Sequence, residues 1–201
     1  RPWWEWPVPL ARRHDETLDQ ARAELADSMG LHAFTQFLFF RQWQAVRALA
    51  RSCGIRLIGD LPIYVAHDSV SVWAEPELFQ LDDERNPLVV AGVPPDYFSE
   101  TGQLWGNPIY AWDHHQATGF AWWIQRVRAC LKLVDLIRLD HFRGLEAYWA
   151  VPAGDATAVN GKWILAPGEA LLKTLEQKVG HLPIIAEDLG VITPDVRELR
   201  D

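Results

Sequence analysis

Three segments of the chain share one pattern, in which a helix-like stretch passes into an apolar, strand-like run that ends on an acidic residue. The acidic residues are Asp60, Asp140 and Glu187. Alternation of helices with apolar strands is typical of a parallel sheet with helical crossovers. A (β/α)₈ barrel, whose catalytic residues lie at the carboxyl ends of several strands, fits this pattern. A doubly wound sheet is the competing architecture, although the sequence has no glycine-rich phosphate loop after a first strand.

Hydrophobic periodicity predicts where these elements lie. One helix is expected over residues 15–29, closed by Gly30 as a C-cap, and a second over residues 31–53. Further helices are expected around 120–133 and 169–179, and strands over 55–60, 134–140 and 183–187. Thr193 and Pro194 have the form of an N-cap followed by the first residue of another helix.

The composition excludes several classes of protein. With 49% hydrophobic residues, the 201-residue chain can form one domain or part of a larger one. A net charge of -8 disfavours partners such as nucleic acid and anionic membranes. No apolar run approaches the roughly 20 residues of a membrane helix, and the start lacks the layout of a signal peptide. Because only Cys53 and Cys130 occur, no disulfide framework is expected, and we expect a soluble, cytoplasmic protein.

A long stretch over residues 73–112 is rich in Pro, Gly and Asp and poor in helical periodicity. Structured turns are expected at 94–98 and 102–108. Such a long loop in a compact domain is usually functional, and a solvated insertion pinned by its tryptophans is an equally good interpretation. The chain contains 11 Trp, and flat aromatic rings suit the apolar faces of sugars. Trp105 is the strongest candidate for a sugar contact.

The acidic strand ends suit the cleavage of glycosidic bonds. Cleavage with retention needs a nucleophilic carboxylate and a second carboxyl about 5 to 5.5 Å away that first donates and then removes a proton. Asp140 and Glu187 fit these roles, and Arg138 should share a face with Asp140 and keep it ionised. Glu187 follows an apolar run, so we expect a buried strand and a protonated acid. Alternatively, these acids cap helices or pair with Arg143 and Arg197.

A metal centre is not expected. The sequence places His67 beside Asp68 and His114 beside His115, which are potential ligands. Adjacent histidines on a loop are more often solvated, and no spacing in the chain specifies a tetrahedral or octahedral ligand set.

Four motifs resemble those of 4-alpha-glucanotransferases, the amylomaltases or disproportionating enzymes of glycoside hydrolase family 77. They lie at residues 59–69, 94–108, 138–144 and 185–190. The resemblance extends from Trp4 to the last residues and implies an α/β fold, a (β/α)₈ TIM barrel of the alpha-amylase clan type. Residues 1–201 would then form a central part of the catalytic barrel, about strands three to five, with residues 70–115 as an inserted loop subregion over the active-site cleft.

The resemblance also implies a role for individual residues. Asp140 matches the nucleophile that forms a covalent glycosyl-aspartate intermediate, and Glu187 matches the general acid/base. The positions implied to bind substrate are Asp60, Tyr64, Asp96, Gln103, Trp105, Asn107, Arg138 and His141. The implied activity moves a segment of an α-1,4-glucan from a donor to an acceptor sugar, with malto-oligosaccharides as substrates and no cofactor.

One departure from the family pattern affects the expected activity. The resemblance implies a third catalytic aspartate in a His-Asp motif beyond the acid/base strand, and no such motif follows Glu187 in this sequence. We therefore expect the chain alone to be inactive and to self-associate through exposed barrel edges. Two alternatives remain open, a hydrolase of the alpha-amylase clan and a non-catalytic glucan-binding remnant.

Overall fold

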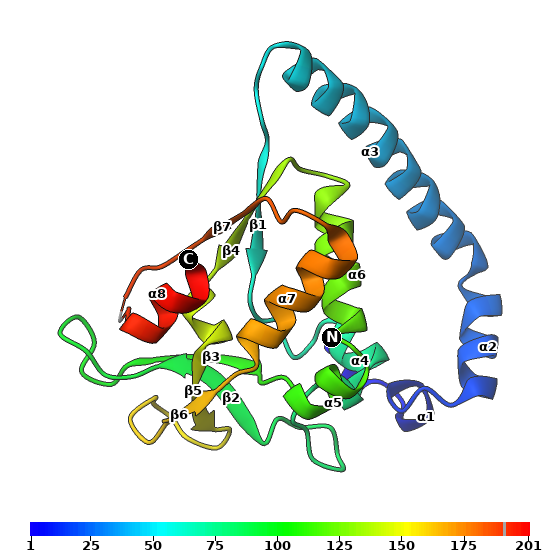
Figure 1. The fold of residues 1–201 in the computed structure, drawn as a ribbon. Coiled ribbons are helices and arrows are strands. Elements are labelled where there is room, and N and C mark those ends of the chain that lie inside the picture. Colours follow the sequence, from blue (N-terminus) through cyan, green and yellow to red (C-terminus); the bar gives the residue numbers. More distant parts are fainter. Residues whose placement is uncertain (191) are drawn as a thin grey trace.

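The computed structural model describes residues 1–190 and 192–201. Within these ranges the chain forms two sheets flanked by helices (Figure 1). The parallel sheet has the strand order β1 (Ile58–Pro62), β4 (Leu136–Asp140) and β7 (Ile184–Ala186). The antiparallel sheet has the order β3 (Gln103–Pro108), β2 (Val89–Val93), β5 (Ala147–Pro152) and β6 (Lys162–Leu165).

The helices follow the predicted alternation with the parallel strands. They are α1 (Val8–Ala11), α2 (Asp15–Glu24), α3 (Ala26–Ser52), α4 (Val70–Ala74), α5 (Trp112–Ala117), α6 (Ala121–Leu131), α7 (Gly168–Val179) and α8 (Pro194–Arg200). Short 3-10 helices occupy η1 (Trp3–Glu5), η2 (Pro76–Leu78) and η3 (Phe142–Leu145). Thus α3 precedes β1, α6 precedes β4, and α7 precedes β7, as predicted.

The parallel sheet separates an apolar face from a charged one. Both strand pairs are parallel, with Asp60 opposite Arg138 in the register and Leu139 opposite Ala186. Leu61, Ile137 and Leu139 are buried in one core cluster with side chains of α6 and α7. Since side chains alternate along a strand, the charged side chains at the intervening positions, Asp60, Arg138 and Asp140, lie on the other face.

Two strand predictions need correction. Asp60 was expected at the end of its strand, but β1 continues to Pro62, because its parallel pairing with β4 extends that far. The strand before Glu187 was expected to be buried, but β7 is half-exposed, with Ile185 42% exposed. In the described part of the chain β7 pairs with β4 alone, which makes it an edge strand.

The predicted C-cap at Gly30 is wrong. The first helix ends at Glu24, and α3 then runs through Gly30 without interruption to Ser52. Gly30 has no positive φ, and a glycine inside a helix costs only about 1 kcal/mol relative to alanine. The chain therefore tolerates Gly30 as an ordinary helical residue. The C-cap glycine in the described chain lies instead at Gly180, after α7, with a φ of 94°.

The stretch predicted to be irregular contributes two strands of the antiparallel sheet. The turn at 94–98 is confirmed, since Asp96 Oδ1 accepts hydrogen bonds from the backbone N–H groups of Phe98 and Ser99. Residues 103–108, expected as a turn, instead form β3, which pairs with β2. Gly92 makes this pairing possible, because a Cβ at its position would lie 2.5 Å from the Gln103 carbonyl oxygen.

Aromatic side chains fill much of the core. Tyr110, fully buried, contacts the rings of Phe79, Trp112 and Trp123 at centroid distances of 5.1 to 5.4 Å. Trp123 is buried, whereas Trp122 is only partly buried. Part of the tryptophan content of the chain therefore serves packing and not ligand binding.

A buried histidine in this cluster predicts acid lability. His115 is fully buried, and its Nε2 lies 3.1 Å from the Leu78 carbonyl oxygen. Burial lowers the pKa of His115 to about 4. The unfolded chain, with an ordinary histidine pKa near 6.5, then binds more protons, so stability falls as the pH drops from about 6.5 to about 4. We expect a loss of about 3 kcal/mol over this range, measured by urea unfolding. His115→Gln should reduce this pH dependence, whereas the exposed His32→Gln should leave it unchanged.

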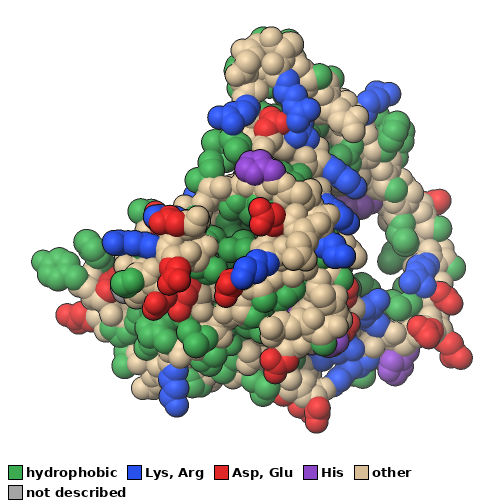
Figure 2. Space-filling view, viewed as in Figure 1, with side chains coloured by type: hydrophobic (Ala, Val, Ile, Leu, Met, Phe, Trp, Pro, Cys, Tyr) green, Lys and Arg blue, Asp and Glu red, His purple; other side chains and the backbone are tan. Residues whose placement is uncertain are grey.

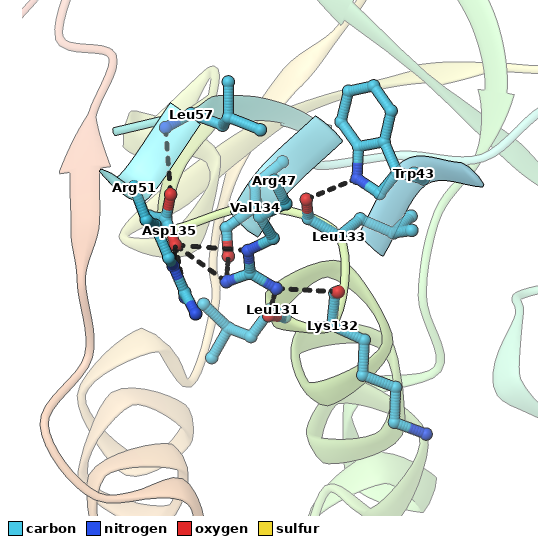
Figure 3. A network of polar contacts seen from close by, with 9 residues as sticks. All are labelled: Trp43, Arg47, Arg51, Leu57, Leu131, Lys132, Leu133, Val134 and Asp135. Atoms are coloured by element: carbon cyan, nitrogen blue, oxygen red, sulfur yellow. Dashed lines mark hydrogen bonds and ion pairs between the residues drawn. The ribbon is translucent and has the colours of Figure 1, made fainter. Parts of the chain in front are cut away.

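A polar network ties the end of α3 to the start of the parallel sheet (Figure 3). Asp135 Oδ1 pairs with Arg47 Nη2 at 2.9 Å and with Arg51, and its Oδ2 accepts a hydrogen bond from Leu57 N at 3.0 Å. Arg47 also donates to the carbonyl oxygens of Leu131, Lys132 and Val134. The network thus joins α3, the segment before β1, the end of α6 and the segment before β4.

Two further expectations concern membrane-spanning helices and disulfide bonds. Among the described residues, no helix is long and apolar enough to cross a membrane. Cys53 is an exposed free thiol, and Cys130 is a partly buried one.

Candidate active site

The charged face of the parallel sheet carries a row of three ionic side chains. Arg138 Nη1 donates to Asp60 Oδ1 at 2.6 Å, and Arg138 Nη2 lies 2.9 Å from Asp140 Oδ1. The hydrogen bond from Arg138 to Asp60, followed by the charges of both aspartates, raises the pKa of Arg138. The predicted shared face of Arg138 and Asp140 is confirmed. The guanidinium bridges two strands and fixes the orientation of the Asp140 carboxylate.

Glu187 lies beside Asp140 on the neighbouring strand. Its backbone N–H donates to the Leu139 carbonyl oxygen at 3.1 Å, which continues the β4–β7 ladder. One register step beyond Leu139 and Ala186, residues 140 and 187 fall opposite each other. The Glu187 Oε2 accepts a hydrogen bond from His141 N at 2.9 Å, and Oε1 accepts one from Leu189 N at 2.9 Å. Its carboxylate is therefore held against the residue that follows Asp140.

His141 adopts a left-handed conformation, with a φ of 53°, directly after Asp140. This turn starts η3 and is compact, because a Cβ at Gly144 would lie 2.8 Å from Ile63 Cδ1 and 3.1 Å from His141 Cδ2. Burial lowers the pKa of His141, and the charges of Glu187 and Asp140 only partly oppose that effect. A largely neutral imidazole is the consequence at neutral pH.

The antiparallel sheet brings a tryptophan to this turn. The Trp105 ring on β3 meets the His141 ring edge to face, with centroids 4.7 Å apart, and lies 6.4 Å from the Tyr64 ring. Trp105 Nε1 donates to Gln103 Oε1 at 3.0 Å. Trp105 remains 37% exposed, so a flat apolar surface is available beside the turn that follows Asp140.

Other candidate residues have structural contacts instead. Asn107 Nδ2 donates to the Val65 carbonyl oxygen at 2.9 Å, which ties β3 to the segment after β1. Tyr64 is buried against Tyr110, and burial raises the pKa of its hydroxyl. Asp96 accepts hydrogen bonds within its own turn. The structure therefore brings together Asp60, Gln103, Trp105, Arg138, Asp140, His141 and Glu187.

Sequence reasoning missed Arg126 on α6. Its guanidinium donates to the carbonyl oxygens of Ile63 at 3.1 Å and Pro62 at 2.5 Å, and to the Tyr110 hydroxyl at 3.3 Å. These contacts fix the chain where β1 ends. Periodicity alone could not reveal this, because Arg126 reads as a solvated position on an apolar helix.

The competing interpretations of the acids receive limited support. Among the ion pairs of the described residues, Asp140 and Glu187 pair with neither Arg143 nor Arg197. Arg143 instead pairs with Glu146 at 3.6 Å and stacks over the Trp163 ring. Within residues 1–190 and 192–201, no group of three or more potential ligands is arranged to hold a metal ion.

The fold and the site together define a class of protein. It is an α/β protein that gathers carboxylates, a guanidinium and an aromatic surface at the carboxyl edge of a parallel sheet, the edge at which α/β enzymes bind ligands.

Comparisons with known proteins identify the family within this class. A family model described as 4-alpha-glucanotransferase matches residues 1–201. The chain is 57% identical to a 4-alpha-glucanotransferase from Thermus thermophilus, covering 100% of this chain and 40% of the relative, and 54% identical to one from Aquifex aeolicus, covering 100% and 41%. An amylomaltase from Streptococcus agalactiae in complex with acarbose superposes with a TM-score of 0.95 at 46% identity, covering 99% of this chain and 40% of that one. The chain belongs to the 4-alpha-glucanotransferase family and spans about 40% of the length of these relatives.

Proposed function

We propose that the chain carries the reacting carboxylates of an enzyme that transfers segments of α-1,4-glucan by a retaining double displacement. The observation that carries this proposal is the adjacency of Asp140 and Glu187 on neighbouring parallel strands, with the Glu187 carboxylate bonded to the backbone of His141. Retention needs two carboxyl groups about 5 to 5.5 Å apart, a separation that side chains of adjacent strands can reach, whereas inversion needs a wider gap that also holds water.

In the first step, Glu187 donates its proton to the glycosidic oxygen while an oxygen of Asp140 attacks the anomeric carbon. The bond to the leaving glucan breaks, and a glycosyl-aspartate ester forms. In the second step, Glu187 removes the proton of an acceptor hydroxyl, whose oxygen attacks the anomeric carbon and displaces Asp140. Both carboxyl groups return to their starting states, so no cofactor is consumed.

The surrounding residues support these roles. Arg138 holds the Asp140 carboxylate in one orientation through the 2.9 Å ion pair, so the attacking oxygen is positioned before substrate binds. The His141 ring contacts Trp105 directly after Asp140 in the chain, and we propose that its donor nitrogen reaches a sugar hydroxyl. Asp60, paired with Arg138, offers a further acceptor for hydroxyls along the same face.

The sheet fits the central part of a (β/α)₈ barrel of the alpha-amylase clan type. We propose that β1, β4 and β7 are consecutive barrel strands, about strands three to five. Their parallel order and their intervening helices support this assignment, because β1 pairs with β4 and β4 pairs with β7, the order in which these three strands occur in the chain. Residues 70–115, which contribute β2 and β3 and carry Trp105, would lie over the cleft.

A chimeric protein tests the proposed activity. In this chimera, which we call the graft protein, residues 1–201 replace the matched region of the Thermus thermophilus relative. With maltotriose it should produce both glucose and longer oligosaccharides, because transfer lengthens some chains while it shortens others. A hydrolase of the alpha-amylase clan would give only shorter products. A glucan-binding remnant would bind maltotriose without converting it.

Residues 1–201 alone should transfer no glucan at a measurable rate. The side chains of Asp60 and Asp140 are 57% and 42% exposed, so water can reach an ester at Asp140 and no enclosed site holds the acceptor. The measurement is maltotriose conversion by the chain alone beside the graft protein at equal concentration. Transfer by the isolated chain at a rate comparable to the graft protein would contradict this expectation.

Removal of the Trp105 ring should weaken sugar binding. We expect Trp105→Ala in the graft protein to raise KM for maltotriose on the order of tenfold, or about 1.4 kcal/mol, with a smaller effect on kcat. Trp4→Ala is the matched control, since Trp4 is similarly exposed and also contacts a histidine, His67, at a centroid distance of 4.3 Å. Equal effects of the two substitutions would refute a sugar contact by Trp105.

A further inference from the structure

The turn that follows Asp140 carries a buried cation, Arg143. Among the described residues, the buried class contains only two polar or charged side chains, those of His115 and Arg143. Arg143 lies on η3, two residues after His141, and is 5% exposed. A buried charge is costly unless other groups compensate it, so the surroundings of Arg143 must supply favourable contacts.

Polar contacts compensate this charge only in part. Within the described residues, Arg143 Nε and Nη1 are buried and have no hydrogen-bond partner. Arg143 Nη2 lies 3.6 Å from Glu146 Oε2, which is longer than a charge-assisted hydrogen bond. By contrast, the Arg143 Cζ lies only 3.8 Å from the centroid of the Trp163 ring. Because cation–π contacts are strongest with tryptophan and away from water, this stack is a major contact of the guanidinium.

Trp163 belongs to β6, at the surface of the antiparallel sheet. Its side chain is 40% exposed, and hydrophobic side chains gather over this part of the molecule (Figure 2). The Trp163 ring meets the Trp149 ring edge to face, with centroids 5.3 Å apart. Trp149 is itself held in place, because its Nε1 donates to the Ala158 carbonyl oxygen at 2.8 Å and a Cβ at Gly161 would overlap its indole. The sheet therefore fixes the ring on which Arg143 rests.

The backbone of the same turn is bonded to the residue that carries the second carboxylate. His141 N donates to Glu187 Oε2 at 2.9 Å, and Phe142 N donates to the Glu187 carbonyl oxygen at 3.1 Å. The turn is thus attached to the end of β7 through its backbone and to β6 through the Arg143 side chain. A shift of the turn would move Asp140, which directly precedes it, and the Glu187 carboxylate, which is bonded to it.

We propose that Arg143 is a positioning residue for the reacting carboxylates and that it acts through its stack on Trp163. This role rests on the proposed function, because Arg143 itself takes no chemical step. The stack ties the turn to the antiparallel sheet and so keeps Asp140 at a constant distance from the sugar. Such placement matters, because an error of about 1 Å in the position of reacting groups can lower the rate on the order of a hundredfold.

The test is a double-mutant cycle in the graft protein, with maltotriose as substrate. Arg143→Met removes the charge and keeps an extended side chain, whereas Trp163→Leu removes the aromatic face. We expect each substitution to lower kcat by roughly tenfold or more and to change KM by less than about twofold, because neither side chain binds the sugar. The double variant should be no slower than the slower single variant, since either change already breaks the stack.

Two further variants distinguish positioning from a general loss of folding. Trp163→Phe keeps a flat aromatic face for the guanidinium and should restore most of the kcat that Trp163→Leu loses. This contrast does not require that Arg143→Met folds. Trp4→Leu is the matched control, because Trp4 is 42% exposed and also stacks on a nitrogen-containing side chain, that of His67. It should leave kcat unchanged.

Amide hydrogen exchange in the graft protein measures the position of the turn without any glucan transfer. The amides of His141 and Phe142 should exchange roughly tenfold faster or more in Arg143→Met, whereas those of the β1–β4 ladder should not change. Faster exchange in a graft protein that transfers no glucan would contradict the proposed function but support the stack. Additive losses of kcat in the double variant, a raised KM with unchanged kcat in Trp163→Leu, or unchanged exchange of His141 would each overturn the inference.

Discussion

Replacement of Asp140 by asparagine should abolish glucan transfer in the graft protein, with a loss on the order of 10⁴-fold or more in kcat. The amide has the shape of the carboxylate but is too weak a nucleophile to form the ester. Since Arg138 contacts Asp60 as well as Asp140, the strand geometry should persist. The measurement is the initial rate of glucose release from maltotriose.

The matched control is Asp113→Asn, the same change at an exposed position on α5, which should retain full activity. A second variant identifies the ester directly. Glu187→Gln incubated with a glycosyl fluoride, whose leaving group needs no acid, should accumulate a covalent adduct on the peptide that contains Asp140. Normal transfer by Asp140→Asn, or an adduct on another residue, would eliminate the proposed mechanism.

Removal of the Asp135 carboxylate should be the most destabilising single substitution in the polar network. We expect Asp135→Ala to lower the free energy of unfolding of the chain by about 3 kcal/mol, because Arg47 then remains a largely buried and unpaired charge. Urea unfolding of the chain measures this loss. Arg51→Ala should cost far less, since the Arg51 side chain is 59% exposed. Equal effects of the two substitutions would contradict the assigned role of Asp135.

The same network predicts sensitivity to strong acid. The hydrogen bond from Leu57 N, followed by those from Arg47 and Arg51, holds the pKa of Asp135 well below its usual range. The unfolded chain, with an ordinary aspartate pKa near 3.9, binds more protons below about pH 4, so this stabilisation is lost as the pH falls further. Asp135→Asn should flatten the pH dependence of stability below about pH 4 only. The dependence between about pH 6.5 and 4, which His115 causes, should remain unchanged.

The parallel part of the fold could be predicted because its signals are local. Apolar runs at 134–140 and 183–187 each follow an amphipathic helix, and both became strands of one sheet. The antiparallel sheet could not be predicted in this way. Strand β3 contains Gly106 and follows Gly102, so its sequence predicts turns, and only its pairing with β2, which itself pairs with β5, makes it a strand.

In the candidate site, too, features set by local sequence could be predicted, whereas features set by long-range contacts could not. The shared face of Arg138 and Asp140 follows from strand alternation, and the structure confirms it. The contacts of Arg126 with the carbonyl oxygens at the end of β1 and just after it cross more than 60 positions of sequence, and no local pattern carries that information. Likewise, the exposure of β7 depends on its place at the sheet edge, which residue types alone do not specify.

The backbone amide that follows Asp140 donates to the Glu187 carboxylate, and this contact couples two groups that belong to different strands. Movement of the sheet edge would ordinarily alter the spacing of two side chains on separate strands. Here the Glu187 carboxylate is hydrogen-bonded to the main chain directly after Asp140, so both side chains would shift together when the edge loosens. The spacing of the two carboxylates can thus survive fluctuations that the hydrogen bonds between the strands do not resist.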